Sequence, residues 1–254
     1  MYKSFTSQQY KEHLGLPDEY RVDGVLCYGT MNEQKMLEAL RFNLDEMNIQ
    51  TDIVPLDNPF LRFIREFRIE GKTYWFMIGY GGAWLSEYLH WACLFGSEKN
   101  ILLGSCGGLK PGMKPADFII PTSSYAEESS ARMYNRESNV HVADVELSDR
   151  LAARIQEGAK VWRGPMVTCQ AMIGETKEDV IQWSEQGYYA VEMEAATVFA
   201  VSTHFNVPSA ASVYVADNLI EDHTAISEEY ALEGDTRYQN QRKQIRAALE
   251  ELLS

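Results

Sequence analysis

Short apolar runs alternate with helix-spaced patterns along most of this chain. Apolar runs that predict strands cover residues 22–29, 66–71, 72–82, 100–108, 116–125, 164–174 and 209–218. Apolar residues three and four positions apart predict helices over 32–48, 86–96, 148–158, 179–187 and 236–253. This alternation predicts an α/β sandwich with a mixed, largely parallel sheet. No repeat or Pro/Gly/Ser-rich linker interrupts the pattern, so residues 1–254 are expected to form one domain.

Glycine-rich turns follow three of the predicted strands, at 28–32, 79–84 and 104–108. A glycine in such a turn lets backbone N–H groups approach a ligand closely. Ligands of α/β proteins bind at the carboxyl ends of the strands, so the three turns are expected to line one pocket. None of them matches the G-x-G-x-x-G pattern or the G-x-x-x-x-G-K-[ST] phosphate loop, which argues against a dinucleotide or ATP as ligand.

The charge balance limits the partners that this chain can bind. Its 23 Lys and Arg residues stand against 37 Asp and Glu residues, for a net charge of −14. An acidic chain gains no affinity from counterion release, so we expect neither nucleic acid nor an anionic membrane as a partner. A substrate that carries a phosphate group needs a local positive site against this field.

The cysteines and the first residues of the chain indicate a reducing compartment. Four cysteines lie far apart in apolar runs and are expected to be buried free thiols: Cys27, Cys93, Cys106 and Cys169. No histidine or cysteine spacing indicates a metal site. Residues 1–15 lack the layout of a signal peptide, and no apolar run approaches the roughly 20 residues that span a bilayer. We therefore expect a cytoplasmic protein.

Two glutamates, Glu192 and Glu194, interrupt the apolar segment YYAVEMEAATVFAV. Carboxylates are costly to bury unless they are paired or hydrogen-bonded. One interpretation is a helix start, where both side chains meet free backbone N–H groups. The other is that one glutamate accepts hydrogen bonds from the vicinal hydroxyls of a sugar. Asp217, at the end of a predicted strand, is either a cap or turn residue or, in a pocket with Glu194, a general acid.

Three segments together resemble the nucleoside phosphorylase family: GSCGGLKPGMKPADFIIP, VEMEAATVFAV and VYVADN. That family includes purine nucleoside and uridine phosphorylases, methylthioadenosine/adenosylhomocysteine nucleosidase and AMP nucleosidase. The resemblance implies a three-layer α/β/α sandwich with a mixed, partly barrel-like central sheet. It also implies a homo-oligomer (dimer or hexamer), a nucleoside or nucleotide substrate, and no cofactor besides phosphate as a co-substrate.

The resemblance also assigns roles around the substrate. Glu194 holds the ribose 2′ and 3′ hydroxyls, Met193 packs beneath the sugar and Glu192 lies beside them. Asp217 matches the acid that protonates N7 of a purine, which favours a purine over uracil. The remaining substrate-binding positions are Gly107 in the third glycine turn and two residues that stand where the family usually has an aromatic side chain against the base, Met172 and Ile173.

The residues that would bind the acceptor of the ribosyl group match the family less well than those around the sugar and the base. Gly29 and Ser105 match residues of the family's phosphate site, but Glu33 and Leu102 stand where phosphorylases have arginines. Without these arginines a phosphate dianion is poorly held, so we slightly prefer water as acceptor, positioned by Glu33 or by Gln34. Two alternatives remain, a phosphate-dependent purine or uridine phosphorylase and an inactive nucleoside-binding protein. An arginine could come from within the chain or from a neighbouring subunit, the candidates being Arg62, Arg65 and Arg68.

Overall fold

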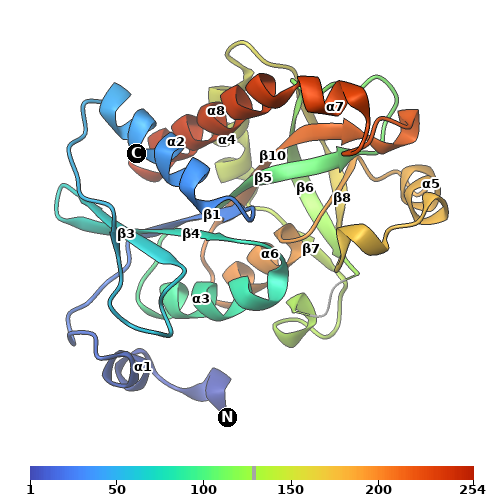
Figure 1. The fold of residues 1–254 in the computed structure, drawn as a ribbon. Helices are drawn as coiled ribbons and strands as arrows, with labels where there is room; N and C mark the ends of the chain where they lie inside the picture. The colour runs from blue at the N-terminus through green and yellow to red at the C-terminus, as the bar shows by residue number, and fades with distance from the viewer. Residues whose placement is uncertain (128–129) are drawn as a thin grey trace.

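The structure is a computed structural model that describes residues 1–127 and 130–254. Its sheet contains β1 (Gly24–Gly29), β2 (Val54–Pro55), β3 (Ile64–Ile69), β4 (Lys72–Gly79), β5 (Asn100–Gly108), β6 (Phe118–Ala126), β7 (Val140–Val142), β8 (Val161–Thr168), β9 (Ala190–Glu192) and β10 (Ser209–Asn218). The strands follow the order β10-β6-β8-β9-β5-β1-β4-β3-β2, and β10 also pairs with β5. This extra pairing closes β10, β6, β8, β9 and β5 into a barrel (Figure 1). The strands β1, β4, β3 and β2 extend from the barrel, and we call them the wing.

The strand directions are mixed. β1 runs parallel to both β4 and β5, and the pairs β5–β10, β6–β8 and β8–β9 are also parallel. Antiparallel pairs join β9 to β5, β10 to β6 and β3 to β4. The β3–β4 hairpin turns at Glu70 and Gly71, whose φ angles of 52° and 80° suit the twist of a tight hairpin.

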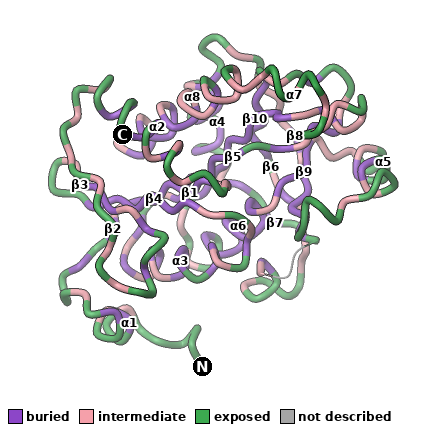
Figure 2. Tube along the Cα trace, viewed as in Figure 1, coloured by how far each residue is buried: buried purple, intermediate pink, exposed green. Residues whose placement is uncertain are grey.

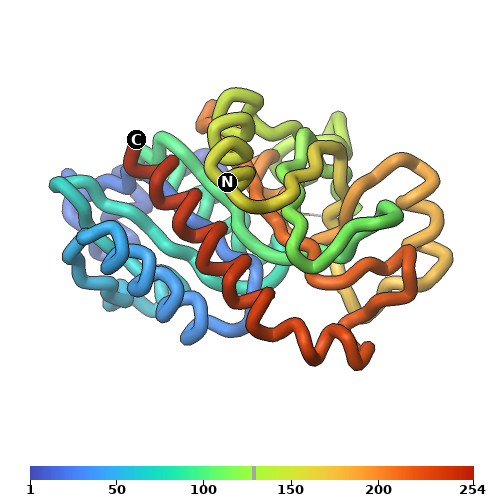
Figure 3. Tube along the Cα trace, turned by 90° about the horizontal axis from the view of Figure 1, so that it is seen from above, coloured from blue at the N-terminus to red at the C-terminus, as the bar shows by residue number. Residues whose placement is uncertain are grey.

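Helices cover both faces of the sheet. They are α1 (Ser7–Leu14), α2 (Glu33–Glu46), α3 (Gly82–Leu94), α4 (Val145–Gln156), α5 (Lys177–Glu185), α6 (Ala195–His204), α7 (Glu228–Leu232) and α8 (Gly234–Leu252). One face carries α2, α4 and α8, with α8 between the other two (Figure 3). The opposite face carries α3 and α6, which pack against each other (Figure 1). The predicted three-layer arrangement with a barrel-like sheet is therefore confirmed.

β1 shows why the central strands appear as unbroken apolar runs in the sequence. Leu26 and Tyr28 point into the core beneath α2 and α8, whereas Val25 and Cys27 point into the core beneath α3 and α6. A strand buried on both faces needs apolar residues at every position. Burial follows the strands and the inner sides of the helices, and exposure is concentrated in the connecting loops (Figure 2).

The prediction of one strand over 164–174 is wrong beyond Thr168. β8 pairs with β6 and β9 as far as Thr168, after which Cys169 donates one more backbone hydrogen bond, to the carbonyl of Glu192 at 2.8 Å. The chain then leaves the sheet, and Met172–Gly174 form a 3₁₀ turn without a buried residue. In the sequence, the apolar residues Met172 and Ile173 look like a continuation of the strand, although they lie outside the sheet.

Other boundaries differ from the prediction by up to four residues, and two of them lie at the second glycine turn. The strand predicted over 72–82 ends at Gly79, and α3 begins at Gly82 instead of at residue 86. Gly81 precedes the helix with a φ of 90°, so the glycine turn serves as the start of the helix. The sequence analysis did not anticipate the short elements α1, β2, β7 and α7.

Candidate active site

A cavity of about 540 Å³ lies at the carboxyl ends of β1, β4, β5, β8, β9 and β10. Ligand sites of α/β folds occur at this end of the strands. All but one of the predicted site residues line the cavity, namely Gly29, Ser105, Gly107, Met172, Ile173, Glu192, Met193, Glu194 and Asp217. The strand topology thus brings together residues that lie far apart in the sequence.

Glu194 lies at the junction of β9 and α6, where it is the N-cap residue of the helix. Its Oε1 atom accepts a hydrogen bond from the backbone N–H of Gly81 at 2.6 Å. A Cβ atom on Gly29 would lie 2.5 Å from Oε2 of Glu194, so glycine at this position leaves room for the carboxyl group where it now lies. Burial and the neighbouring charge of Glu192 raise the pKa of Glu194 above its ordinary value.

Glu192, the last residue of β9, makes different contacts. Its Oε2 atom accepts hydrogen bonds from the backbone N–H groups of Glu194 and Ala195, each at 2.8 Å. Its Oε1 atom accepts a hydrogen bond from the hydroxyl of Thr168 at 2.5 Å. These are the contacts that the helix-start interpretation expects, and among the two glutamates Glu192 makes them. Glu192 caps the helix, and the carboxyl group of Glu194 faces Gly29 and Gly81.

Asp217 reaches the cavity from β10 just after a bulge. The register of β10 against β5 shifts between Val215 and Asp217, which leaves Ala216 as the extra residue. Burial raises the pKa of Asp217 to about 6, with His223 opposing the shift and Glu175 adding to it. A carboxyl group with this pKa holds its proton in a useful fraction of molecules near neutral pH.

The mouth of the cavity is apolar. Met172 is 47% exposed and Ile173 is 89% exposed, on the 3₁₀ turn after β8, and Ile226 on the loop after β10 is 96% exposed. The hydroxyl of Tyr80 lies 3.8 Å from the Sδ atom of Met172. Tyr80 was not predicted as a site residue, although it stands inside the second glycine turn. Glu175, which directly follows the predicted strand 164–174, also lines the cavity and was not predicted as a site residue.

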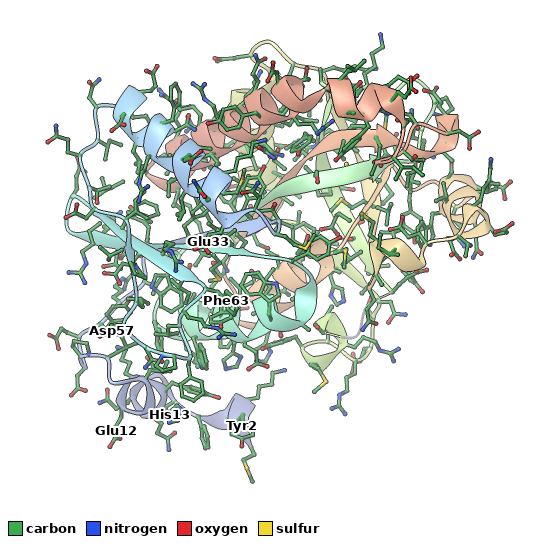
Figure 4. All side chains as sticks on the ribbon, in the orientation of Figure 1. Tyr2, Glu12, His13, Glu33, Asp57 and Phe63 are labelled. Atoms are coloured by element: carbon green, nitrogen blue, oxygen red, sulfur yellow. The ribbon has the colours of Figure 1, made fainter. Side chains whose placement is uncertain are left out.

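The predicted site residue that does not line the cavity is Glu33. It lies in the first turn of α2 and forms an ion pair with Arg65 of β3. Figure 4, in which Glu33 and Phe63 are labelled, shows both beside the wing. The side chain of Gln34 is bonded to Glu38 on its own helix at 3.0 Å. These placements do not support a water-positioning role for Glu33 or Gln34.

Each of the candidate arginines has a partner on or near the wing. Arg65 pairs with Glu33, Arg68 lies 3.0 Å from Glu66, and the Arg62 guanidinium lies 4.7 Å from the ring centre of Phe63. Among the described residues that line the cavity, Lys177 is the only basic one, and its Nζ atom lies 2.8 Å from Asp222. The cavity wall is therefore acidic, because five carboxyl side chains share it: Glu175, Glu192, Glu194, Asp217 and Asp222.

Residues 1–127 and 130–254 contain no group of three or more His, Cys, Asp or Glu side chains arranged to hold a metal ion. Their helices are too short or too polar to cross a membrane.

Comparisons with known proteins agree with this geometry. A guanosine phosphorylase from Halorubrum lacusprofundi is 30% identical over 126 residues, which are 49% of this chain and 52% of the relative. A DeoD-type purine nucleoside phosphorylase from Thermoanaerobacter sp. (strain X514) is 25% identical over 154 residues, 59% of this chain and 66% of the relative. The match thus spans about half to two thirds of the length of these curated relatives.

The fold has close counterparts among solved structures. The uridine phosphorylase from Vibrio fischeri ES114 superposes with a TM-score of 0.76 at 17% identity, and the superposition covers 98% of both chains. The same enzyme complexed with 6-hydroxy-1-naphthoic acid gives a TM-score of 0.77. At this identity the likeness concerns the fold alone. A sequence model of the phosphorylase superfamily matches residues 70–254, well over half of the chain, and the protein is therefore a member of that superfamily.

Proposed function

We propose that this protein cleaves the N-glycosidic bond of a purine nucleoside and transfers the ribosyl group to inorganic phosphate. One observation carries the proposal: Glu194 and Asp217, two carboxyl groups in different surroundings, line the same cavity at the strand ends. The named activities of the curated relatives, guanosine and purine nucleoside phosphorylases, support both the purine base and phosphate as the acceptor.

In the proposed reaction the bond between C1′ and the base breaks ahead of attack by the acceptor. Positive charge develops on the ribosyl ring and negative charge on the base. Protonated Asp217 transfers its proton to N7 of the base, which leaves as the neutral purine. Glu194 accepts hydrogen bonds from the 2′ and 3′ hydroxyls and so holds the sugar in place while the bond breaks. Met193 lies between Glu192 and Glu194, where it packs beneath the sugar.

The acceptor then attacks C1′ from the side of Gly29 and Ser105. Ser105 is exposed to the cavity in a strand that is otherwise largely buried, and its hydroxyl is available as a donor to a phosphate oxygen. Attack by a phosphate oxygen forms the new bond to C1′ and gives ribose 1-phosphate with the free base.

Water is the second candidate acceptor, and the charge of the cavity favours it. Lys177 and Asp222 already pair with each other, so the described lining offers a phosphate dianion no unpaired cation. A neutral acceptor needs none. The names of the relatives favour phosphate, whereas the local electrostatics favour water. The two acceptors give different sugar products, so identifying the product distinguishes them.

The test is base release from guanosine, inosine, adenosine, methylthioadenosine, AMP and uridine, measured by chromatography with and without phosphate. Purine release that depends on phosphate and yields ribose 1-phosphate supports the proposal. Equal release without phosphate identifies a nucleosidase. Uracil release alone contradicts the purine assignment, and no release from any substrate leaves a nucleoside-binding protein.

A further inference from the structure

The first turn of α6 obtains its cap from outside the helix. The first backbone N–H groups of a helix have no partner within it, and the side chain of the N-cap residue commonly accepts one of them. The N-cap residue here is Glu194, whose side chain makes no capping hydrogen bond. Its carboxyl group extends instead to the N–H of Gly81, at 2.6 Å.

Glu192 and Thr168 supply the cap. Oε2 of Glu192 accepts the N–H groups of Glu194 and Ala195 at 2.8 Å, and the hydroxyl oxygen of Thr168 accepts the N–H of Ala196 at 2.9 Å. Thr168 is the last residue of β8, on a different strand from Glu192. Both side chains are buried, Thr168 completely and Glu192 to all but 6%.

The hydroxyl of Thr168 is used to its full capacity. A hydroxyl has one hydrogen to donate and two lone pairs that accept. The hydrogen goes to Oε1 of Glu192 at 2.5 Å, and one lone pair accepts the N–H of Ala196. The hydroxyl of Ser124, whose oxygen lies 2.8 Å away on β6, then donates to the second lone pair. Every bond of this hydroxyl therefore has a fixed direction, and together the bonds fix the position of Glu192.

We propose that Thr168 is a positioning residue for Glu194: with Glu192 it caps α6, and so leaves the carboxyl group of Glu194 free to bind the sugar hydroxyls. This inference rests on the proposed function, in which Glu194 contacts the ribose. Without the hydroxyl of Thr168, Glu192 loses one of the donors that hold it, and the N–H of Ala196 loses its acceptor. Because Glu194 is the N-cap residue, its carboxyl group is then expected to turn away from the cavity and to accept the unpaired N–H.

The experiment compares a ribonucleoside with its 2′-deoxy counterpart, because only the former offers both hydroxyls to Glu194. For Thr168→Val we expect kcat/KM to fall about tenfold or more for the ribonucleoside and clearly less for the deoxynucleoside. The ratio of the two kcat/KM values therefore falls. Thr168→Ser retains the hydroxyl and restores the ratio. The matched control is Thr73→Val, at a buried threonine at the opposite end of β4, which leaves the ratio unchanged.

The outcomes separate this inference from the proposed function. A wild-type protein that releases no base overturns both. Wild-type activity with an equal loss for the two substrates in Thr168→Val means that Thr168 serves only to stabilise the fold, and overturns the inference alone. If Thr168→Val does not fold, Ser124→Ala replaces it, since this variant removes the donor behind Thr168. The same ratio is then expected to fall by about two- to fivefold, and an unchanged ratio overturns the inference.

Discussion

Asp217 lies at the end of β10, and the groups around it shift its pKa in opposite directions. Burial and Glu175 favour the protonated form, whereas His223 favours the ionised form. The net effect is a pKa raised to about 6, within reach of neutral pH. A general acid works best when its pKa lies near the working pH, so this environment suits proton donation to a leaving base.

Replacing Asp217 by Asn should lower kcat by about 10²–10⁴-fold and change the KM for the nucleoside little, because the proton is transferred only in the transition state. The acid form is the active one, so wild-type kcat/KM should decline as the pH rises above about 6. Steady-state kinetics across pH 5–9 checks both points. An unchanged kcat in Asp217→Asn would exclude Asp217 as the acid.

The same substitution should stabilise the fold above pH 6. Because the pKa is raised from 3.8 to about 6, ionised Asp217 destabilises the folded state above that pH, and the effect disappears below pH 4, where the carboxyl is neutral in both states. Thermal unfolding of Asp217→Asn should show a gain of about 1–3 kcal/mol at pH 7.5 and none at pH 3.5. A loss of stability at pH 7.5 would contradict this account of the buried carboxyl group.

The β9–α6 junction shows what sequence reasoning reached and what it did not. The pattern VEMEA and its distance from Asp217 were enough to place Glu192, Glu194 and Asp217 at one site. It was not predictable that Glu192 caps the helix while Glu194 faces the cavity. This difference depends on the hydroxyl of Thr168, which lies 24 residues before Glu192 on another strand. The ion pair of Glu33 was not predictable for a similar reason, since its partner Arg65 lies on a strand whose position relative to α2 cannot be read from local pattern.

The close approach of β1 to this junction gives a sharp test. Gly29→Ala would place a methyl group 2.5 Å from Oε2 of Glu194, and the flexible carboxyl group has to move rather than the strands. We expect kcat/KM for the nucleoside to fall about 10–100-fold with little change in the melting temperature.

The control is Gly234→Ala at the start of α8, where an added Cβ meets no atom within 4 Å. It should leave kinetics unchanged and stabilise the helix by up to about 1 kcal/mol. Normal activity in Gly29→Ala would mean that Glu194 does not need its present position.

The layers of the whole chain were predictable from local sequence pattern, whereas the closure of the barrel was predicted only through the resemblance to the family. Alternating apolar runs and helix patterns predict an α/β sandwich, and the strands over 100–108 and 209–218 were placed with the bounds that the structure shows. The barrel closes through the pairing of β10 with both β5 and β6. These pairings join strands that are far apart in the sequence, and local hydrophobic periodicity contains no information about them.

The net charge of −14 and the acidic cavity wall lead to a prediction about salt. If phosphate is the acceptor, it approaches against a repulsive field, which salt screens over a Debye length of about 10 Å at 0.1 M. The KM for phosphate should therefore fall as potassium chloride is raised from low concentration, while the KM for the uncharged nucleoside stays constant. A phosphate KM that rises with salt would indicate that cations outside the described lining dominate the site.

In the proposed reaction the closed barrel and the wing hold different parts of the chemistry. Asp217, Ser105 and Glu192 stand on strands of the barrel, where each strand is fixed by neighbours on both sides. Gly29, on the acceptor side of the proposed reaction, stands on β1 of the wing. If the proposal holds, a mutation in the wing can alter which nucleophile reaches C1′ while the acid that releases the base keeps its place. A change from phosphorolysis to hydrolysis would then need substitutions in only one part of the sheet.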